Sequence, residues 1–410
     1  MPNISKRGEN VPMSPFRKLV PFADQAKANG KHVYHLNIGQ PDIETPAYAL
    51  EQVRKNQEKI LAYSPAVGKL SYRQKLAAYY RSFGVELGPE HFIVTTGASE
   101  AIQFALLSCL DAVEEVIVPE PFYANYNGFA QIGDIRIKPI TCHIEDGFAL
   151  PEIEAFEALI GPKTRGIFIT NPNNPTGSFY SRAKLLALGE LAVKHDLFLF
   201  VDEVYREFCY DGQDFFSALR LRGAENNVVV IDSISKRYSA CGARIGAMVT
   251  QNEAVLEAAT RYAKLRLSPP GLAQVLAEAT LDMEGAYMAE VKAEYDRRRQ
   301  VVYHRLQAMP GVTSYLPGGA FYCFAKFPVD SSERFCRWLL EGFEYRGATV
   351  MLSPGAGFYA TPGLGQDEVR MAYVLNTTDL EAAMDCLEEG LEEYCSLHAA
   401  AIPGLRSNNS

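Results

Sequence analysis

Short, almost uninterrupted apolar runs recur between residues 92 and 249, and they restrict the fold more than any other feature of the chain. They are rich in β-branched and aromatic residues and span 92–96, 115–118, 135–137, 166–170, 197–201, 228–231 and 246–249. Such strands are typical of a sheet covered on both faces. Helical spacing separates several runs, as in Glu100 to Asp111 and Ser181 to Lys194. This alternation predicts an α/β fold, a mainly parallel seven-stranded sheet flanked by helices.

The pattern changes after a long helix that we expect from Glu284 to Met309, where Pro310-Gly311 would end it. Beyond this helix, short strands are expected at 321–327 and 368–374, with helices between and after them. That mixture is typical of a small α+β domain.

A chain of 410 residues is long enough for two domains. We expect a large domain at 46–300 and a smaller one formed by residues 1–45 together with 301–410. The segment from Ile402 to Ser410 is expected to be frayed, because its end is polar.

Composition excludes several classes of partner. The net charge of −9 argues against nucleic acid or an anionic membrane as the main partner. Met1 to Asn10 has basic residues but no apolar core of a secretory signal, and no apolar run approaches the roughly 20 residues that span a bilayer. The eight cysteines are scattered without a C-x-x-C pair, and the seven histidines show no metal-ligand spacing. We therefore expect a cytoplasmic protein with free thiols and no metal.

In an open α/β sheet, ligands bind beyond the carboxyl ends of the strands, so the residues after each apolar run are informative. Gly97-Ala98-Ser99 follows the first run and opens a helix, whose free backbone N–H groups suit a phosphate. Tyr123 follows the second run and suits stacking on a flat ring, with core packing as the alternative. The turn-rich segment 171–177 follows another run, and its Asn174 suits an anionic oxygen.

Two charged residues lie in strongly apolar surroundings. Asp202 follows the run at 197–201, where a carboxylate needs a cation such as a protonated pyridine nitrogen. Tyr205, three residues later, would reach the opposite side of that ring. Arg370 lies within a short apolar strand, where its planar fork suits a carboxylate. The alternative for Arg370 is a structural ion pair.

Lys236 follows the run at 228–231, with Ser233 and Ser235 before it and Arg244 eight residues after it. A lysine amine forms a Schiff base with an aldehyde cofactor, and hydroxyl and guanidinium groups hold a phosphate. Pyridoxal 5′-phosphate (PLP) is the cofactor that needs both. The alternative is a solvated lysine at a strand end.

Taken together and in this order, these residues resemble the class I/II aminotransferases of fold type I, the aspartate-aminotransferase-like PLP enzymes. The resemblance covers roughly Val33 to Leu391. It is carried by Asn-Pro-x-Asn-Pro-Thr-Gly at 171–177, Asp-x-x-Tyr at 202–205, Ser-x-Ser-Lys at 233–236, Arg244 and Arg370.

The resemblance implies roles for these residues toward PLP. Lys236 would form the Schiff base and move the proton between the substrate Cα and the cofactor's C4′. Asp202 would pair with the pyridinium nitrogen, and Tyr205 and Asn174 would hold the phenolate oxygen. Tyr123 would stack on the ring. The phosphate would be held by Ala98, Ser99, Ser233, Ser235 and Arg244.

The resemblance also implies how substrate is bound. Arg370 would bind the α-carboxylate together with Asn174, and Gly39, in a segment similar to the family's substrate-closing loop, would lie near it. Tyr63 matches a tyrosine that crosses to the neighbouring subunit's phosphate, which implies a homodimer with shared active sites. Arg266 is similar to an arginine that recognises dicarboxylates across the subunit interface, with a plain surface arginine as the alternative. Cis peptides are expected at Glu120-Pro121 and Asn174-Pro175.

The implied function is ping-pong transamination between an L-amino acid and a 2-oxo acid, with aspartate, glutamate and 2-oxoglutarate as candidate substrates. A PLP-dependent lyase acting on carbon–sulfur bonds is the main alternative on the same fold. A serine hydrolase is a remote one, because Ser233 to Lys236 satisfies S-x-x-K but no S-D-N or K-T-G partner occurs. A third alternative is a catalytically silent PLP-binding regulator. Such proteins usually carry an added DNA-binding module, for which we expect this chain to have neither the room nor the charge.

Overall fold

The computed structural model describes residues 2–12, 17–283 and 285–398. The predicted fraying from Ile402 to Ser410 lies outside the described residues, as does Glu284, the expected start of the long helix. None of the helices described is both long and apolar enough to cross a membrane.

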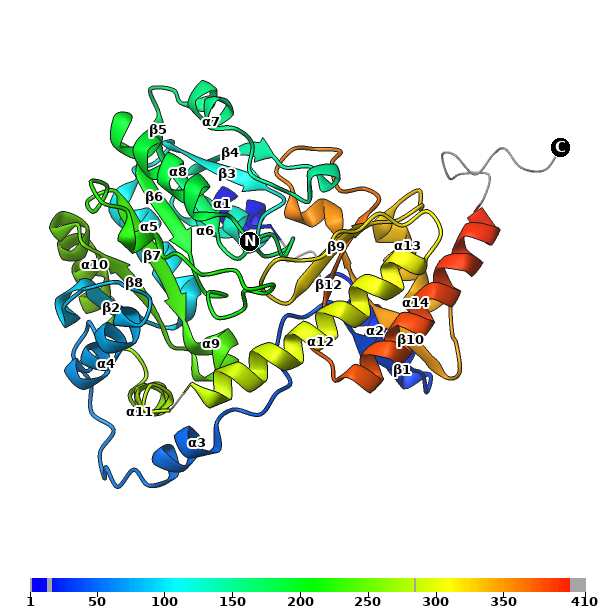
Figure 1. Cartoon of the computed structure of the whole chain (residues 1–410), viewed down its shortest axis with the longest axis horizontal. Coiled ribbons are helices and arrows are strands. Elements are labelled where there is room, and N and C mark those ends of the chain that lie inside the picture. The colour runs from blue at the N-terminus through cyan, green and yellow to red at the C-terminus, as the bar shows by residue number, and fades with distance from the viewer. Residues whose placement is uncertain (1, 13–16, 284, 399–410) are drawn as a thin grey trace.

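A seven-stranded sheet forms the centre of the larger part of the molecule (Figure 1), with strand order β2-β8-β7-β6-β5-β3-β4. The strands are β2 (Phe92–Thr95), β3 (Glu115–Glu120), β4 (Arg136–Thr141), β5 (Thr164–Thr170), β6 (Phe198–Asp202), β7 (Val228–Ser233) and β8 (Gly246–Thr250). Strand β8 runs antiparallel to both neighbours, and the four remaining neighbouring pairs are parallel. Each strand overlaps one apolar run, so the predicted mainly parallel sheet is confirmed.

Both faces of this sheet are buried, as the apolar runs predicted. Val228 and Val230 of β7 belong to one apolar core, while Val229 and Ile231 belong to another, because successive side chains of a strand point to opposite faces. The helices of this part are α3 (Ala47–Arg54), α4 (Leu70–Arg81), α5 (Gly97–Cys109), α6 (Asn125–Ile132), α7 (Ile153–Leu159), α8 (Arg182–Lys194), α9 (Ile234–Arg237), α10 (Glu253–Arg266) and α11 (Gly271–Thr280). The two helices expected between strands are α5 and α8.

The smaller part has two short sheets. Strand β1 (His32–His35) pairs in parallel with β10 (Ala348–Met351), and β12 (Glu368–Ala372) lies between β9 (Tyr322–Lys326) and β11 (Ser353–Pro354) in an antiparallel sheet. The predicted strands at 321–327 and 368–374 correspond to β9 and β12. The remaining helices are α1 (Lys6–Asn10), α2 (Val20–Ala28), α12 (Ala286–Ala308), α13 (Ser332–Glu341) and α14 (Thr377–His398).

Helix α12 joins the two parts of the molecule (Figure 1). It contains residue 300, at which the sequence divided the domains, so that division falls inside a continuous helix. Its Val291 and Val302 belong to the same apolar core as Phe321 and Met371 of the smaller part. The domain division stays a prediction. Helix α12 is continuous across the predicted boundary and connects the two parts of the molecule.

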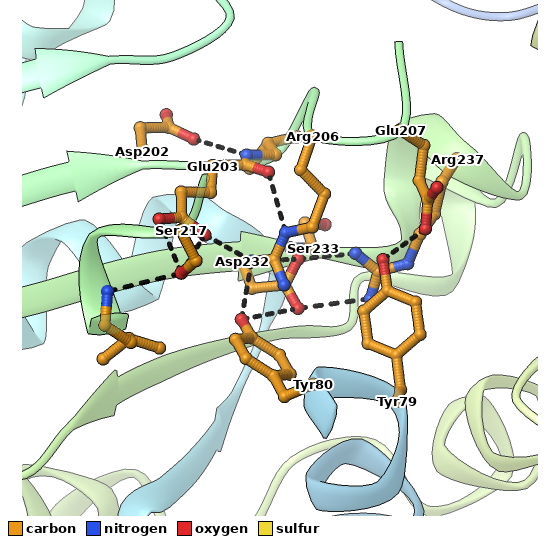
Figure 2. Close-up of polar contacts among 12 residues, drawn as sticks. Tyr79, Tyr80, Asp202, Glu203, Arg206, Glu207, Ser217, Asp232, Ser233 and Arg237 are labelled. Carbon is orange, nitrogen blue, oxygen red and sulfur yellow. Dashed lines mark hydrogen bonds and ion pairs between the residues drawn. The ribbon is translucent and has the colours of Figure 1, made fainter. Parts of the chain in front are cut away.

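A cluster of buried charges lies behind the carboxyl ends of β6 and β7 (Figure 2). Arg237 donates to both carboxylate oxygens of Asp232, at 2.6 and 3.2 Å. Arg206 lies 3.5 Å from Asp232 and 3.3 Å from Glu203. All four side chains are only 1% exposed. We refer to these four residues as the charge cluster; each charge depends on its partners, because a buried charge is costly without one.

The charge cluster alternates along the chain with residues of the predicted site. Asp202, the last residue of β6, and Tyr205 each directly precede a cluster residue. Ser233, the last residue of β7, directly follows one, and Lys236 directly precedes one. The cluster therefore holds the backbone of both segments at positions next to residues of the predicted site.

Replacing Asp232 should destabilise the protein strongly. Burial opposes its ionisation, but Arg206 and Arg237 outweigh burial and lower the pKa of Asp232 from 3.8 to about 2. Asp232→Asn leaves two buried guanidinium groups short of a carboxylate, so the free energy of unfolding at pH 7 should fall by about 3–5 kcal/mol in urea titrations. The exposed Asp134→Asn should change it by less than about 0.5 kcal/mol.

The same pair of proteins gives a pH test. A carboxyl whose pKa is lowered by folding contributes stability above its unfolded pKa, and this contribution is lost as pH falls through the folded value. The difference between wild type and Asp232→Asn should therefore shrink as pH falls from about 4 to about 2. Equal stability of the two proteins at pH 7 would show that other groups compensate the arginines.

Candidate active site

The carboxyl ends of β5, β6 and β7 face a cavity of about 310 Å³. Its size is within the range of small-molecule sites. Predicted site residues that line it are Gly39, Ala98, Ser99, Tyr123, Asn174, Asp202, Tyr205, Ser233, Ser235, Lys236, Arg244 and Arg370. The fold thus brings together twelve of the fourteen residues singled out in the sequence, and Tyr63 and Arg266 lie elsewhere.

Lys236 reaches into the cavity from the short helix α9. Ser233 caps this helix by accepting a hydrogen bond from the backbone N–H of Ser235 at 3.1 Å. The Lys236 amine donates to the carbonyl oxygen of Gly39 at 2.7 Å, and it lies 3.9 Å from the thiol of Cys241. The amine therefore points across the cavity to the loop that carries Gly39, which was predicted to lie near the substrate.

This geometry does not suit the serine hydrolase alternative. That reading needs Lys236 to act on the hydroxyl of Ser233. Instead, Lys236 donates to Gly39, and the Ser233 hydroxyl donates to the carbonyl of Ile245 at 2.9 Å. The two groups of the S-x-x-K pattern are engaged with different partners.

The start of α5 and Arg244 form a pocket suited to a phosphate. Gly97 has φ +74°, and a Cβ on it would lie 2.9 Å from the guanidinium carbon of Arg244, so the arginine lies directly over this helix end. Arg244 adopts left-handed backbone (φ +56°) and donates to the carbonyl of Cys241 at 2.9 Å. A helix N-terminus, a guanidinium and the hydroxyls of Ser233 and Ser235 together can bind a dianion.

Asp202 supplies a buried carboxylate at the end of β6. One oxygen accepts from the hydroxyl of Tyr126 at 2.9 Å, and the other accepts from the backbone N–H of Val204 at 3.1 Å. Burial raises the pKa of Asp202 from 3.8 to about 6, although these two donors act in the opposite direction. A cation in the cavity would favour the ionised form, and a protonated pyridine nitrogen is such a cation.

Asn174 lies between Arg370 and Tyr205. Its oxygen accepts from Arg370 at 3.1 Å, and its amide nitrogen lies 3.5 Å from the Tyr205 hydroxyl. Arg370 also donates to the carbonyl of Asn37 at 2.6 Å. Burial lowers the pKa of Arg370, so a carboxylate ligand would be favoured there. The peptide between Asn174 and Pro175 is cis, as predicted.

Other cis peptides and the aromatic wall complete this region. The Glu120-Pro121 bond is cis, as predicted, and Asn171-Pro172 is cis without having been predicted. Tyr123 follows the first of these bonds, lines the cavity and accepts from the amide of Asn125 at 2.8 Å.

Two tyrosines of the cavity wall, Tyr126 and Tyr322, were not predicted from the sequence. Tyr126, the hydroxyl donor to Asp202, lies three residues after Tyr123, and helical spacing after a strand end was a signal for it. Tyr322 gave no signal, because it begins β9 in the smaller part and reaches the cavity only through the packing of the two parts.

The structure places Arg266 in an ion pair within its own chain. It is neither a plain surface residue nor part of the cavity, because its side chain is only 15% exposed and bonds to Glu100 at 2.6 Å. It also donates to the carbonyl oxygens of Ala66 and Val94. These contacts engage Arg266 within its own chain, and recognition of a dicarboxylate across the subunit interface stays a prediction for this residue.

The arrangement fits PLP on the chemistry of its donors. A phosphate pocket, a buried carboxylate and a primary amine converge on one cavity, in which Arg370 offers a second anion site. Over the described ranges, no group of three His, Cys, Asp or Glu side chains is placed to hold a metal ion.

Comparisons with known proteins agree with this chemistry. The model of the family "Aminotransferase class I and II" matches residues 31–387. Aromatic-amino-acid aminotransferase 2 of Thermococcus litoralis is 31% identical over 398 residues, covering 95% of this chain and 98% of that protein. Aspartate aminotransferase of Pyrococcus horikoshii is also 31% identical, covering 95% and 97%.

Solved structures show the same fold. Aspartate aminotransferase from Thermus thermophilus with maleate superposes with a TM-score of 0.87 at 27% identity, covering 95% of this chain and 100% of that chain. Alanine aminotransferase from Pyrococcus furiosus gives 0.87 at 29% identity, with the same coverage. These proteins are all named aminotransferases, so they give no support to the lyase alternative. The chain belongs to the class I and II aminotransferases and is a PLP-dependent enzyme of the type I fold.

Proposed function

We propose that this aminotransferase works by a ping-pong reaction in which Lys236 is both the amine that links the cofactor and the carrier of the substrate's Cα proton. The observation that carries this assignment is the convergence of Lys236, Asp202 and Arg370 on one cavity. When bound, PLP supplies an aldehyde that condenses with amines and a ring that withdraws electrons from Cα.

The residues around the ring would each act on one part of it. The Asp202 carboxylate would keep the ring nitrogen protonated, which strengthens electron withdrawal. Tyr205 and Asn174 would donate to the phenolate oxygen, and Tyr123 would stack on the ring face. The phosphate would be bound by the start of α5, with Ala98 and Ser99, and by Ser233, Ser235 and Arg244.

On the substrate side, Arg370 would bind the α-carboxylate of the amino acid in bidentate fashion. Asn174 would orient that arginine through the 3.1 Å hydrogen bond between them. Once an incoming amino acid displaces it, Lys236 would take the proton from Cα and return it at C4′. The loop that carries Gly39 already contacts the Lys236 amine, so it lies where it would exclude water from this transfer.

Aspartate and glutamate are the donors that we propose first, with 2-oxoglutarate as acceptor, because several relatives are named aspartate aminotransferase. Other relatives are named for aromatic amino acids or alanine. Recognition of a second carboxylate by Arg266 would require it to leave Glu100, to which it bonds at 2.6 Å.

We further propose that the active unit is a homodimer in which Tyr63 contacts the phosphate held by the partner. Tyr63 is 79% exposed, and the nearby Ile60 and Leu61 are 80% and 65% exposed. These residues line one surface hollow with Pro269 and Leu272. An exposed apolar surface of this kind typically marks a protein interface.

A cytoplasmic location is also proposed. All eight cysteines are free thiols in the structure. Disulfides are rare in the cytoplasm, where thiols are kept reduced.

Lys236→Ala tests the function directly. Purified wild type should show the absorption band of bound PLP, and the L-amino acid that serves as donor should bleach it with release of one equivalent of its 2-oxo acid. Lys236→Ala should fold normally but lose more than about a thousandfold in turnover, because both linking amine and proton carrier are removed. The exposed Lys163→Ala is the matched control and should retain wild-type turnover. Substantial transamination by Lys236→Ala would overturn the assignment.

Mixing two inactive variants tests the shared site. If Tyr63 acts on the partner's phosphate, Tyr63→Ala and Lys236→Ala are each nearly inactive as homodimers. A mixed dimer then has one doubly altered site and one intact site, so co-refolded variants should recover part of the wild-type activity. A mixture that forms mixed dimers but stays inactive would mean that Tyr63 serves its own chain, and sedimentation at the monomer mass would remove the homodimer proposal.

A further inference from the structure

Tyr322 touches several predicted site residues from the smaller part of the molecule. It begins β9 and is only 2% exposed. Its hydroxyl lies 2.9 Å from the hydroxyl of Tyr205. The guanidinium carbon of Arg370 lies 4.7 Å from the centre of its ring. A Cβ on Gly39 would lie 2.6 Å from Cζ of Tyr322, so the loop that contacts Lys236 rests against the same side chain.

The role proposed for Tyr205 determines which of the two hydroxyls donates in the hydrogen bond between Tyr205 and Tyr322. Tyr205 has a single hydroxyl hydrogen, and an ionised phenolate oxygen only accepts hydrogen bonds. If Tyr205 donates its hydrogen to that oxygen, its own oxygen is left to accept the hydrogen of Tyr322 at 2.9 Å. Consecutive hydroxyl donors polarise one another, so Tyr322 strengthens the bond that Tyr205 makes.

The ring of Tyr322 acts on a different group. Arg370 lies between two aromatic rings, with its guanidinium carbon 4.7 Å from the ring of Tyr322 and 4.9 Å from that of Phe358. Aromatic faces attract a guanidinium and hold its plane. The edges of Arg370 donate to Asn174 and to the carbonyl of Asn37. The ring contacts on its faces and the hydrogen bonds at its edges together set the orientation in which the Arg370 guanidinium would meet a carboxylate.

We infer that Tyr322 is a positioning residue that couples the cofactor side of the site to the substrate side. Its hydroxyl acts on the cofactor's phenolate oxygen through Tyr205, and its ring acts on the substrate's α-carboxylate through Arg370. The inference rests on the proposed function, since both targets are groups that the proposed reaction brings into the cavity.

Two variants separate the hydroxyl from the ring. Tyr322→Phe removes only the hydroxyl, whereas Tyr322→Leu removes the ring as well. The PLP-loaded enzymes are compared by the midpoint of the pH-dependent change of the cofactor's absorption band, and by KM for the amino acid that bleaches wild type. Neither quantity depends on fold stability as such.

Tyr322→Phe should move the absorbance midpoint upward by roughly half to one pH unit, the effect of one hydrogen bond. The reason is that donors to the phenolate oxygen compete with the proton on the adjacent linking nitrogen, so weaker donors let this proton persist to higher pH. KM should stay within about twofold, because the ring over Arg370 remains. Tyr322→Leu should show the same upward movement and a KM raised about tenfold, since the support of Arg370 is lost.

Tyr394→Phe is the matched control. This tyrosine lies in α14, and its hydroxyl donates to Asp330 at 2.7 Å, outside the cavity. It should move neither quantity. An unchanged or lowered midpoint in Tyr322→Phe would overturn the hydroxyl role, and an unchanged KM in Tyr322→Leu would overturn the ring role. If Tyr322→Leu does not fold, an unchanged midpoint in Tyr322→Phe still overturns the coupling. Wild type without a cofactor band would overturn the proposed function first, and the inference with it.

Discussion

The buried pairing of Asp232 with Arg237 and Arg206 is the constraint on which the rest of the site depends. A carboxylate and two guanidinium groups, each only 1% exposed, are stable only in mutual contact, so the segments that carry them have little freedom relative to one another. Those same segments carry Lys236 and Tyr205, each next in sequence to a cluster arginine, and both line the cavity. The position of the Lys236 amine relative to Tyr205 and Asp202 thus depends on ion pairs among side chains that do not line the cavity.

The sheet and the smaller part contribute differently to the cavity. Parallel strands end at one edge, so the sheet brings Asp202, Asn174 and Lys236 together by topology. Arg370 and Tyr322 come from β12 and β9 of the smaller part. The convergence of Arg370 with Asp202 and Lys236 on one cavity therefore requires both parts to be packed together, and α12 joins the two parts (Figure 1).

The position of Arg266, the candidate for recognising a substrate side chain, is determined differently from the positions of the cavity residues. Asp202 and Ser233 line the cavity at strand ends and are held there by main-chain geometry. Arg266 lies at the end of α10, where Glu100 and two carbonyl oxygens engage its two terminal guanidinium nitrogens. A long, flexible side chain such as that of arginine can reach several alternative partners. Its contacts therefore depend on which residues surround it in the folded protein, and its position in the sequence does not predict them.

The seven strands, their mainly parallel pairing and the polar residues after their ends that line the cavity could all be predicted from the sequence. This was possible because burial on both faces needs continuous apolar runs, and because the first polar residue after such a run faces the edge of the sheet. Three features appear only in the folded structure: the pairing of Arg266 with Glu100, the contacts among the four buried ionisable side chains of the charge cluster, and the position of Tyr322 in the cavity wall. These contacts join side chains that lie far apart in the sequence and meet only after folding. The local periodicity of the sequence therefore does not predict them.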